Sequence, residues 1–149
     1  MDNRTIGSDP TKPGASGLDV LGGLKIVLVD DEPGVLRALT LLLQALKCEV
    51  SSFDTPGAAL SYLVTKPPVD LVLSDMRMPE FSGAELLRSV RRSELRVPFI
   101  LMSGHATNEE VSEARALGLQ GFISKPFTPA QLADLVALAL GRPAEQTTT

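Results

Sequence analysis

The sequence predicts an α/β fold in which five parallel strands form one doubly wound sheet covered by helices on both faces. Five short β-type runs alternate with five helical patterns along the chain. Three of these runs are almost wholly apolar, as expected for parallel strands that are covered on both sides. Strict alternation with short connections requires crossover helices, which pack on the two faces of the same sheet.

The strand candidates differ in their apolar content. Nearly continuous apolar runs predict central strands at Leu24–Val29, Val69–Leu73 and Val97–Met102. Polar residues interrupt the runs Cys48–Phe53 and Gln120–Ser124. A strand at the margin of a sheet is less completely covered, so these two runs are predicted to be edge strands.

The helices carry start and stop signals. Pro33 and the pair Thr55-Pro56 stand where proline fits a first helical turn. Three other starts have capping-box spacing: Ser82 with Glu85, Thr107 with Glu110, and Thr128 with Gln131. Gly118 and Gly141 fit helix ends. After Pro33, one apolar stripe recurs at helical spacing and consists of Val35, Leu36, Leu39, Leu42, Leu43 and Leu46.

Length and composition limit the possible functions. The chain has 149 residues, of which 44% are hydrophobic, which suits one domain with a sizeable core. The single cysteine, Cys48, excludes an intrachain disulfide and a cysteine-based zinc site, and the single histidine, His105, excludes a multi-histidine site. A net charge of −4, with five Phe, one Tyr and no Trp, argues against direct nucleic-acid binding.

We expect three segments: a flexible N-terminal tail at 1–23, one domain at 24–141 and a disordered C-terminal tail at 142–149. Residues 1–23 are rich in Gly, Ser, Pro, Thr and Asp, and residues 142–149 end in three threonines. Both segments contain few large apolar side chains that could offset the entropy cost of ordering. No apolar leader follows Met1, and no uncharged apolar run approaches the ~20 residues that span a bilayer. We therefore expect a cytoplasmic protein without membrane contact.

Polar side chains stand just past four of the predicted strands. Asp30 and Asp31 follow the first, Asp75 the third, Ser103 the fourth and Lys125 the fifth. Each alone is most simply a helix cap or a loop residue. Together they bring three carboxylates, a hydroxyl and an ammonium to the carboxyl ends of the strands, where open α/β sheets bind ligands.

The charges in this set predict a metal ion. Two carboxylates about 5 Å apart repel by roughly 3 kcal/mol at an effective dielectric constant of about 20. Either their pKa values rise or a divalent cation binds. Oxygen ligands favour a hard ion such as Mg²⁺. A carboxylate beside that ion can act as the nucleophile that forms an aspartyl phosphate.

From about Leu24 to Gly141, the chain resembles the receiver domain of two-component response regulators. The motifs that carry this resemblance are Val29-Asp30-Asp31-Glu32, Ser74-Asp75-Met76-Arg77-Met78-Pro79 with Gly83, Met102-Ser103-Gly104, and Phe122-Ile123-Ser124-Lys125-Pro126-Phe127. Each motif is short, but all occur in order at the predicted strand ends. The resemblance implies a flavodoxin-like sheet with strand order 2-1-3-4-5.

The resemblance also implies a role for each site residue. Asp75 would be the phosphoacceptor and a ligand of Mg²⁺. Asp31 would bind the ion directly, Asp30 directly or through water, and Arg77 through its main-chain carbonyl. Three further groups would contact or pair with the phosphoryl group, namely the Ser103 hydroxyl, the Gly104 N–H and the Lys125 ammonium. A cis peptide bond is expected before Pro126.

Two further expectations concern the signal. Phosphorylation would draw Ser103 inward and let Phe122 follow, although Phe122 can equally be a plain core residue. The output surface would be the fourth helix, fifth strand and fifth helix, a candidate homodimer interface. Arg77 and His105 flank the site and are predicted to set the lifetime of the phosphorylated state, the alternative being two solvated rim residues.

The resemblance implies a phosphorelay function. A histidine kinase or phosphotransfer protein would supply the phosphoryl group, and a downstream protein or fused output domain would receive the signal. The chain would then catalyse only its own phosphorylation and dephosphorylation. One alternative is a Mg²⁺-dependent phosphohydrolase with an aspartyl nucleophile, which would require Asp-x-Asp where this chain has Asp30-Asp31-Glu32. Another is a receiver-like binding module that is never phosphorylated.

Overall fold

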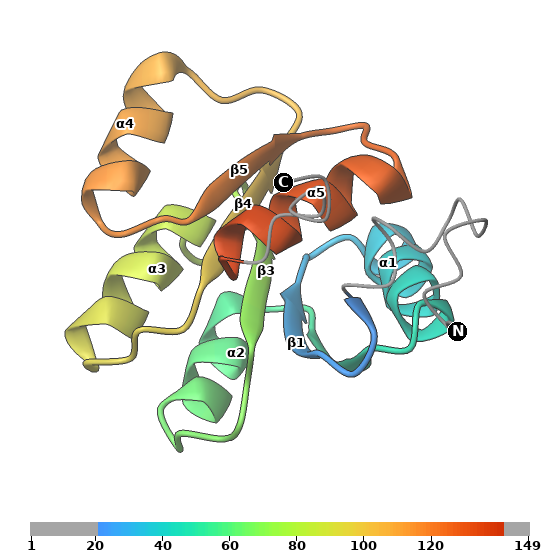
Figure 1. Ribbon diagram of the computed structural model, residues 1–149. Helices are drawn as coiled ribbons and strands as arrows, with labels where there is room; N and C mark the ends of the chain where they lie inside the picture. The colour runs from blue at the N-terminus through green and yellow to red at the C-terminus, as the bar shows by residue number, and fades with distance from the viewer. Residues whose placement is uncertain (1–20, 142–149) are drawn as a thin grey trace.

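A computed structural model describes residues 21–141, in which strands and helices alternate (Figure 1). The strands are β1 (Lys25–Val29), β2 (Glu49–Phe53), β3 (Leu71–Asp75), β4 (Phe99–Ser103) and β5 (Gly121–Ser124). The helices are α1 (Pro33–Ala45), α2 (Pro56–Leu63), α3 (Gly83–Arg92), α4 (Asn108–Ala116) and α5 (Pro129–Ala139). None of the helices in this part of the chain is both long and apolar enough to cross a membrane.

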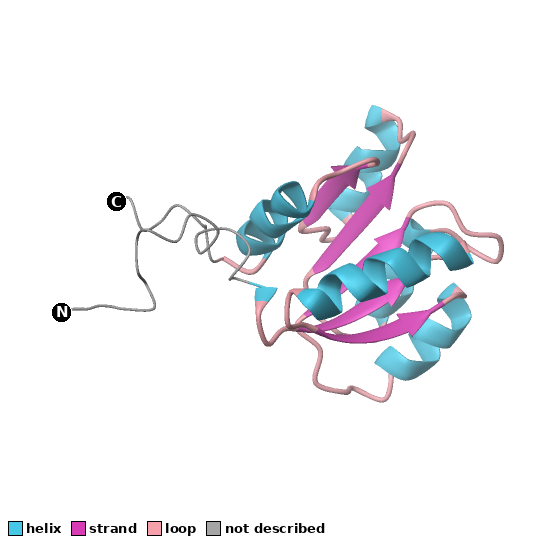
Figure 2. Ribbon diagram, turned by 90° about the vertical axis from the view of Figure 1, so that its right-hand side faces the viewer, coloured by secondary structure: helices cyan, strands magenta, loops and turns pink. Residues whose placement is uncertain are grey.

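All five strands form one parallel sheet in the order β2-β1-β3-β4-β5. The arrowheads in Figure 2 accordingly point to a common edge. The two strands with interspersed polar residues, β2 and β5, are the edge strands, as predicted. The order of strands along the sheet reverses between β1 and β3. The carboxyl ends of the three central strands therefore lie at the point where α/β sheets bind ligands.

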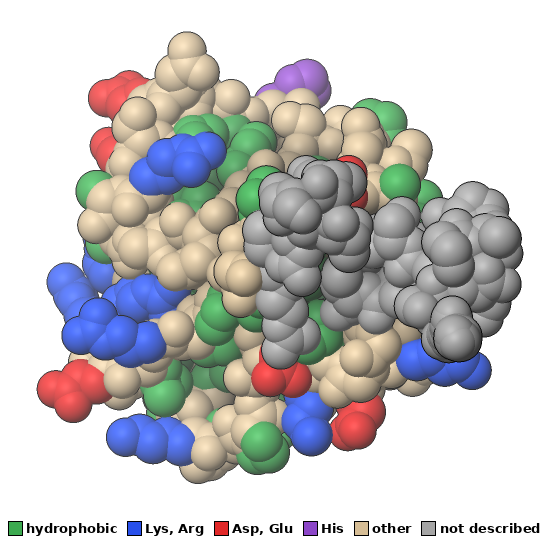
Figure 3. All heavy atoms as spheres, in the orientation of Figure 1, with side chains coloured by type: hydrophobic (Ala, Val, Ile, Leu, Met, Phe, Trp, Pro, Cys, Tyr) green, Lys and Arg blue, Asp and Glu red, His purple; other side chains and the backbone are tan. Residues whose placement is uncertain are grey.

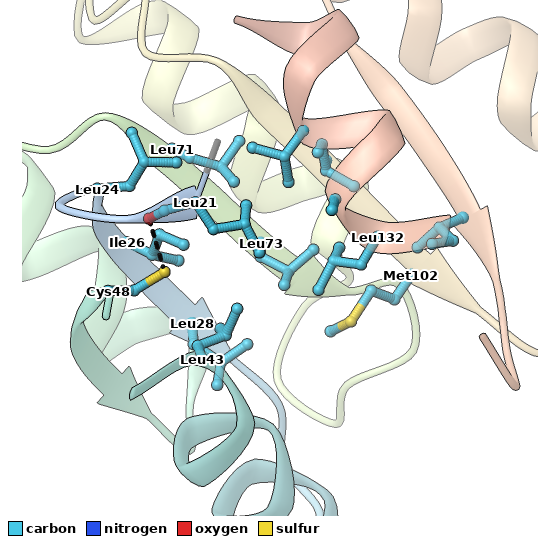
Figure 4. Packing of buried hydrophobic residues seen from close by; sticks show 14 residues of the cluster. Leu21, Leu24, Ile26, Leu28, Leu43, Cys48, Leu71, Leu73, Met102 and Leu132 are labelled. Atoms are coloured by element: carbon cyan, nitrogen blue, oxygen red, sulfur yellow. Dashed lines mark hydrogen bonds between the residues drawn. The ribbon is translucent and has the colours of Figure 1, made fainter. Parts of the chain in front are cut away.

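Alternating side chains of the strands fill two separate cores. Ile26 and Leu28 of β1 face one core, which α1 and α5 cover. Val27 and Val29 of the same strand face the other core, which α2, α3 and α4 cover. Figure 4 shows the first core, where Leu73 and Met102 approach Leu132. Because helices cover both faces of the sheet, the central strands have nearly continuous apolar sequences.

Two strands end later than the sequence predicted. β3 continues to Asp75 and β4 to Ser103, and both pair in the parallel ladder, Asp75 with Met102 and Ser103 with Ser124. Pro98 has no N–H to donate, which moves the start of β4 from the predicted Val97 to Phe99. Asp75 and Ser103 are therefore held by strand backbone, not by a flexible loop.

The start of the domain differs from the prediction that residues 1–23 form a tail. Leu21 is completely buried in the α1/α5 core, and its carbonyl accepts a hydrogen bond from the Cys48 thiol at 3.2 Å. The Gly-rich sequence around Leu21 has no periodic apolar pattern that would mark this residue as part of the core. Burial raises the pKa of Cys48 to about 11, so the thiol stays protonated and acts as a packing group. The remainder of the two predicted tails, 1–20 and 142–149, lies outside the described residues.

The predicted helix starts are confirmed. Complete capping boxes begin α3, α4 and α5, in which Ser82, Thr107 and Thr128 exchange hydrogen bonds with the residue three positions later. Thr55 caps α2 by accepting a hydrogen bond from the Ala58 N–H. Gly118 and Gly141, which follow α4 and α5, have φ values of 92° and 71°, where glycine avoids the steric cost of a side chain.

Basic side chains gather over the C-terminal part of α3, on the left of Figure 3. Three of them, Arg88, Arg92 and Arg96, are exposed. Arg91 instead donates hydrogen bonds to the carbonyls of Leu95, Val97 and Gly118 at 2.9–3.0 Å. Arg91 thus ties the loop before β4 to the loop before β5. Its burial, with the charge of nearby Arg96, lowers its pKa.

Candidate functional site

Three carboxylates meet at the carboxyl edge of the sheet, as the sequence predicted. Asp30 and Asp31 follow β1, and Asp75 ends the adjacent strand β3. One carboxylate oxygen from each lies within 4.8 Å of the others. Asp30 is 0% exposed and Asp75 only 7% exposed, whereas Asp31 is half-buried. Parallel pairing of β1 with β3 brings together residues that are 45 positions apart in the chain.

Lys125 supplies the positive charge of this cluster. Its Nζ lies 2.9 Å from Asp75 Oδ1 and 3.2 Å from Asp30 Oδ2. The Lys125 main-chain N–H donates to the Ser103 carbonyl at 2.8 Å, which anchors the residue to the end of β4. The peptide bond between Lys125 and Pro126 is cis, as expected. The ammonium therefore bridges two carboxylates carried by neighbouring strands.

The cluster has more negative charge than Lys125 can neutralise. Burial raises the pKa of Asp75, and the charge of Asp30 adds to this effect, while Lys125 opposes it. Burial alone would lower the pKa of Lys125, but its hydrogen bond to Asp75 and the charges of Asp30 and Asp75 outweigh burial and raise it. Ionised, the three carboxylates and one ammonium carry a formal charge of −2. An oxygen-lined site of this charge is compatible with a hard divalent cation.

The two neighbouring aspartates are not equivalent. Asp30 Oδ1 accepts the Glu32 N–H at 3.0 Å, and Oδ2 accepts from Lys125. Both oxygens of this buried side chain therefore have a partner within the protein. Asp31 is more accessible, and no described residue hydrogen-bonds to its carboxylate. Of the pair, Asp31 is thus the one whose oxygens are available to an incoming cation.

The hydroxyl of Ser103 is buried at the end of β4. Its Oγ accepts the main-chain N–H of His105 at 3.1 Å. Gly104 and the His105 side chain are exposed. The predicted hydroxyl therefore lies at the end of the strand next to β3, which carries Asp75. It accepts a hydrogen bond from the backbone at the start of the loop between β4 and α4.

Arg77 makes an interaction that the sequence did not reveal. Its guanidinium binds both carboxylate oxygens of Glu110 in α4, at 2.8 and 2.9 Å. It also donates to the His105 carbonyl at 2.8 Å. The capping-box spacing identified Glu110 only as a helix-start residue. Nothing in the spacing indicates a partner 33 positions earlier.

Gly83 lies against the backbone of Asp75. A methyl group at this position would collide with the Asp75 carbonyl oxygen and come within 2.6 Å of Leu101 Cδ2. The Gly83 N–H donates to the Met76 carbonyl at 2.8 Å, which closes the loop between β3 and α3. Gly83 belonged to the sequence motif, but only the packing explains why a glycine stands there.

Phe122 lies on the edge strand β5 and is half-buried against the core beneath α2, α3 and α4. It also lines a groove of about 440 Å³ between β5 and α5. Leu138, on the far wall of this groove, is 65% exposed. Phe122 is therefore neither a fully buried core residue nor a solvated one.

A family model and several known proteins match the part of the chain that forms the sheet and the acidic cluster. The model described as "Response regulator receiver domain" matches residues 26–137. The chain is 34% identical over 125 residues to "Transcriptional regulatory protein FixJ" of Azorhizobium caulinodans, covering 83% of this chain and 58% of that protein. It is 31% identical over 113 residues to "Chemotaxis protein CheY-3" of Vibrio cholerae, covering 74% of this chain and 87% of that protein.

Solved structures agree with these matches. The crystal structure of a response regulator receiver domain protein from Clostridium thermocellum has a TM-score of 0.74 and 25% identity, covering 85% of this chain and 99% of that chain. The crystal structure titled FixJ-N has a TM-score of 0.71 and 28% identity, covering 83% of this chain and 94% of that chain. Several relatives are longer: the chain spans 58% of FixJ, 26% of PilR from Pseudomonas aeruginosa and 19% of ARR21 from Arabidopsis thaliana.

We predict that Gly83→Ala lowers the free energy of unfolding by about 1–3 kcal/mol, because the new methyl group overpacks against the Asp75 backbone. Urea unfolding measures this loss. Gly34→Ala is the matched control, since a methyl group there meets nothing within 4 Å in the first turn of α1. That substitution should be neutral or stabilising by up to about 1 kcal/mol. Equal effects of the two substitutions would contradict the close packing of Gly83.

Proposed function

Because this chain belongs to the response regulator receiver domain family, we propose that it takes a phosphoryl group onto Asp75 and relays its phosphorylation state by changing protein contacts. The observation that supports this proposal is the cluster that Asp75 forms with Lys125, Asp30 and Asp31 at the edge of the sheet. A lone buried aspartate would not suggest it. The combination provides a nucleophile, a cation and a candidate metal site in one place.

In the proposed reaction, a carboxylate oxygen of Asp75 attacks the phosphorus of a phosphohistidine on the donor protein. The new O–P bond forms as the P–N bond breaks, and the electron pair of that bond stays on the imidazole nitrogen. Lys125, already 2.9 Å from Asp75, offsets the charge of the transferring group. Ser103 and the Gly104 N–H would donate hydrogen bonds to its oxygens.

We propose Mg²⁺ as the cofactor, since the donor set is made only of oxygen atoms and has excess negative charge. Asp31, Asp75 and the main-chain carbonyl of Arg77 would hold it directly. Asp30, whose oxygens already have protein partners, would act mainly through bound water. When bound, the ion neutralises charge on the phosphoryl group.

The proposed output runs from Ser103 to the surface around β5. Ser103 would leave its hydrogen bond with His105 and turn toward the phosphoryl group, and Phe122 would move into the space it vacates. The half-buried position of Phe122 and the groove beside it support this step. The surface of α4, β5 and α5 would then present a changed outline to a downstream protein or to a second copy of this chain.

Response regulators act with kinases and with downstream effectors, so we propose a histidine kinase or phosphotransfer protein as the donor. A fused output domain or a separate protein would receive the signal. We propose the cytoplasm, where kinases obtain ATP, as the site of this exchange. The active unit would be the domain over 24–141 extended to include Leu21, and its catalysis would be limited to its own phosphorylation and dephosphorylation.

Acetyl phosphate tests the acceptor directly. With Mg²⁺, the wild-type chain should gain the mass of one phosphoryl group in intact mass spectrometry, because Asp75 is the nucleophile beside Lys125. Asp75→Asn should abolish the gain, as should chelation of the metal with EDTA. Asp54→Asn is the matched control, since Asp54 is exposed at the end of the edge strand β2, and it should label normally.

Each failure has a distinct meaning. A wild-type chain that stays unlabelled would overturn the phosphoacceptor proposal and favour a binding module. Equal labelling of Asp75→Asn would place the acceptor elsewhere. Sustained turnover of a small phosphate ester would favour a phosphohydrolase.

We predict that Arg77 and His105 set the lifetime of the phosphorylated state. The Arg77 guanidinium donates to the His105 carbonyl, the His105 N–H donates to Ser103 Oγ, and both side chains are exposed beside the site, where they would limit the approach of water. Arg77→Ala and His105→Ala should each hydrolyse the aspartyl phosphate at least about twofold faster than the wild type. Loss of label is followed over time by intact mass. Arg88→Ala, on the exposed side of α3, should leave the rate unchanged. Unchanged rates in both site variants would contradict this role.

A further inference from the structure

We propose that Glu110 is a positioning residue that holds the Ser103 hydroxyl in its unphosphorylated position by anchoring Arg77. This inference rests on the proposed function, because it concerns the cost of moving Ser103 toward the phosphoryl group. It adds a residue of α4, outside the acceptor site, to the groups that control phosphorylation. It also gives the Arg77 side chain a partner that determines where it lies.

Four contacts form a closed ring around the loop between β4 and α4. The His105 N–H donates to Ser103 Oγ at 3.1 Å, and the His105 carbonyl accepts from Arg77 at 2.8 Å. Arg77 binds Glu110 through two parallel hydrogen bonds. Glu110 Oε1 also accepts the Thr107 N–H at 3.0 Å. The ring therefore connects the buried hydroxyl to the first turn of α4.

The His105 backbone is the central part of this ring. Its N–H, in the peptide unit shared with Gly104, donates to the serine hydroxyl, and its carbonyl, in the next peptide unit, accepts from the guanidinium. If Ser103 turns away, the N–H loses its partner unless the His105 backbone follows. That backbone is restrained at its carbonyl by Arg77. Anchoring Arg77 therefore raises the cost of moving Ser103.

Glu110 is suited to anchor Arg77. A guanidinium and a carboxylate joined by two hydrogen bonds form the most directional ion pair available to side chains. The Thr107 N–H and Arg77 together lower the pKa of Glu110, so its carboxylate is ionised at neutral pH. Arg77 lies in the loop after β3, two residues beyond Asp75, whereas Glu110 belongs to α4. Their pairing couples the loop that follows the proposed acceptor to a helix of the proposed output surface.

The energy of this coupling is modest. Ion pairs at the protein surface contribute little, so losing this pair should change an equilibrium by about fivefold at most. The effect is thus large enough to measure and small enough for phosphorylation to overcome. The ring would bias the switch without locking it.

Glu110→Gln separates the ion pair from the helix cap. Glutamine serves as the third residue of a capping box, so α4 keeps its start, but the bidentate pair with Arg77 is lost. Glu109→Gln is the matched control, because it removes the same charge from the same helical turn at an exposed residue. The combined variant Arg77→Ala with Glu110→Gln tests whether Glu110 acts through Arg77.

Two measurements follow the proposed effect. Without metal or phosphodonor, amide hydrogen exchange at His105 should be about two- to fivefold faster in Glu110→Gln than in the wild type. With saturating Mg²⁺, the apparent affinity for beryllofluoride, followed by the amide signals of Gly104 and His105, should rise by a similar factor. Glu109→Gln should match the wild type in both. In the Arg77→Ala background, Glu110→Gln should add nothing.

The inference fails if Glu110→Gln and Glu109→Gln behave alike, or if the effect of Glu110→Gln persists undiminished without Arg77. In either case a wild-type chain that still binds beryllofluoride leaves the proposed function intact. A wild-type chain that binds none removes the proposed function and this inference together.

Discussion

The contact between the Lys125 ammonium and the buried carboxylates of Asp30 and Asp75 is the interaction on which the rest of the site depends. Without that cation, burial and the charge of Asp30 would raise the pKa of Asp75 with nothing to oppose them. With it, the cluster keeps an ionised carboxylate and still has excess negative charge. That excess is compatible with a divalent cation at the same edge.

The parallel sheet produces this cluster. Asp75 and Ser103 occupy the last positions of adjacent strands, so their separation is set by the ladder. Lys125 and Asp30 follow the strands on either side of that pair. The loops carry Arg77 after β3 and His105 after β4. Strands thus hold Asp75 and Ser103, and the proposed switch would act through the hydrogen-bonded loop groups beside them.

Sequence reasoning reached the fold and the convergence of the acidic groups because both depend on chain order. Alternation of apolar runs with capped helices predicted a parallel sheet covered on both faces. The resemblance to receiver domains supplied the strand order, which places Asp75 beside Asp30. Sequence reasoning did not reach the Arg77–Glu110 pair, which depends on loop paths and side-chain rotamers. It placed Leu21 in a tail, because the few apolar residues near Leu21 are interrupted by Asp19 and by two glycines and give no periodic signal. Gly83 stands in a recognisable motif, but the reason for a glycine there is its contact with the Asp75 backbone, which only the folded structure shows.

The most direct measurement of the central claim is the affinity for Mg²⁺ in the absence of any phosphodonor, determined by calorimetry for the wild type, Asp31→Asn and Asp54→Asn. Both variants lose one negative charge, but only Asp31 belongs to the cluster. Losing a ligand should weaken binding by at least about tenfold, because even outer-sphere partners of a metal contribute that much. The account predicts this loss for Asp31→Asn and near wild-type affinity for Asp54→Asn. Equal affinities for all three chains would contradict it.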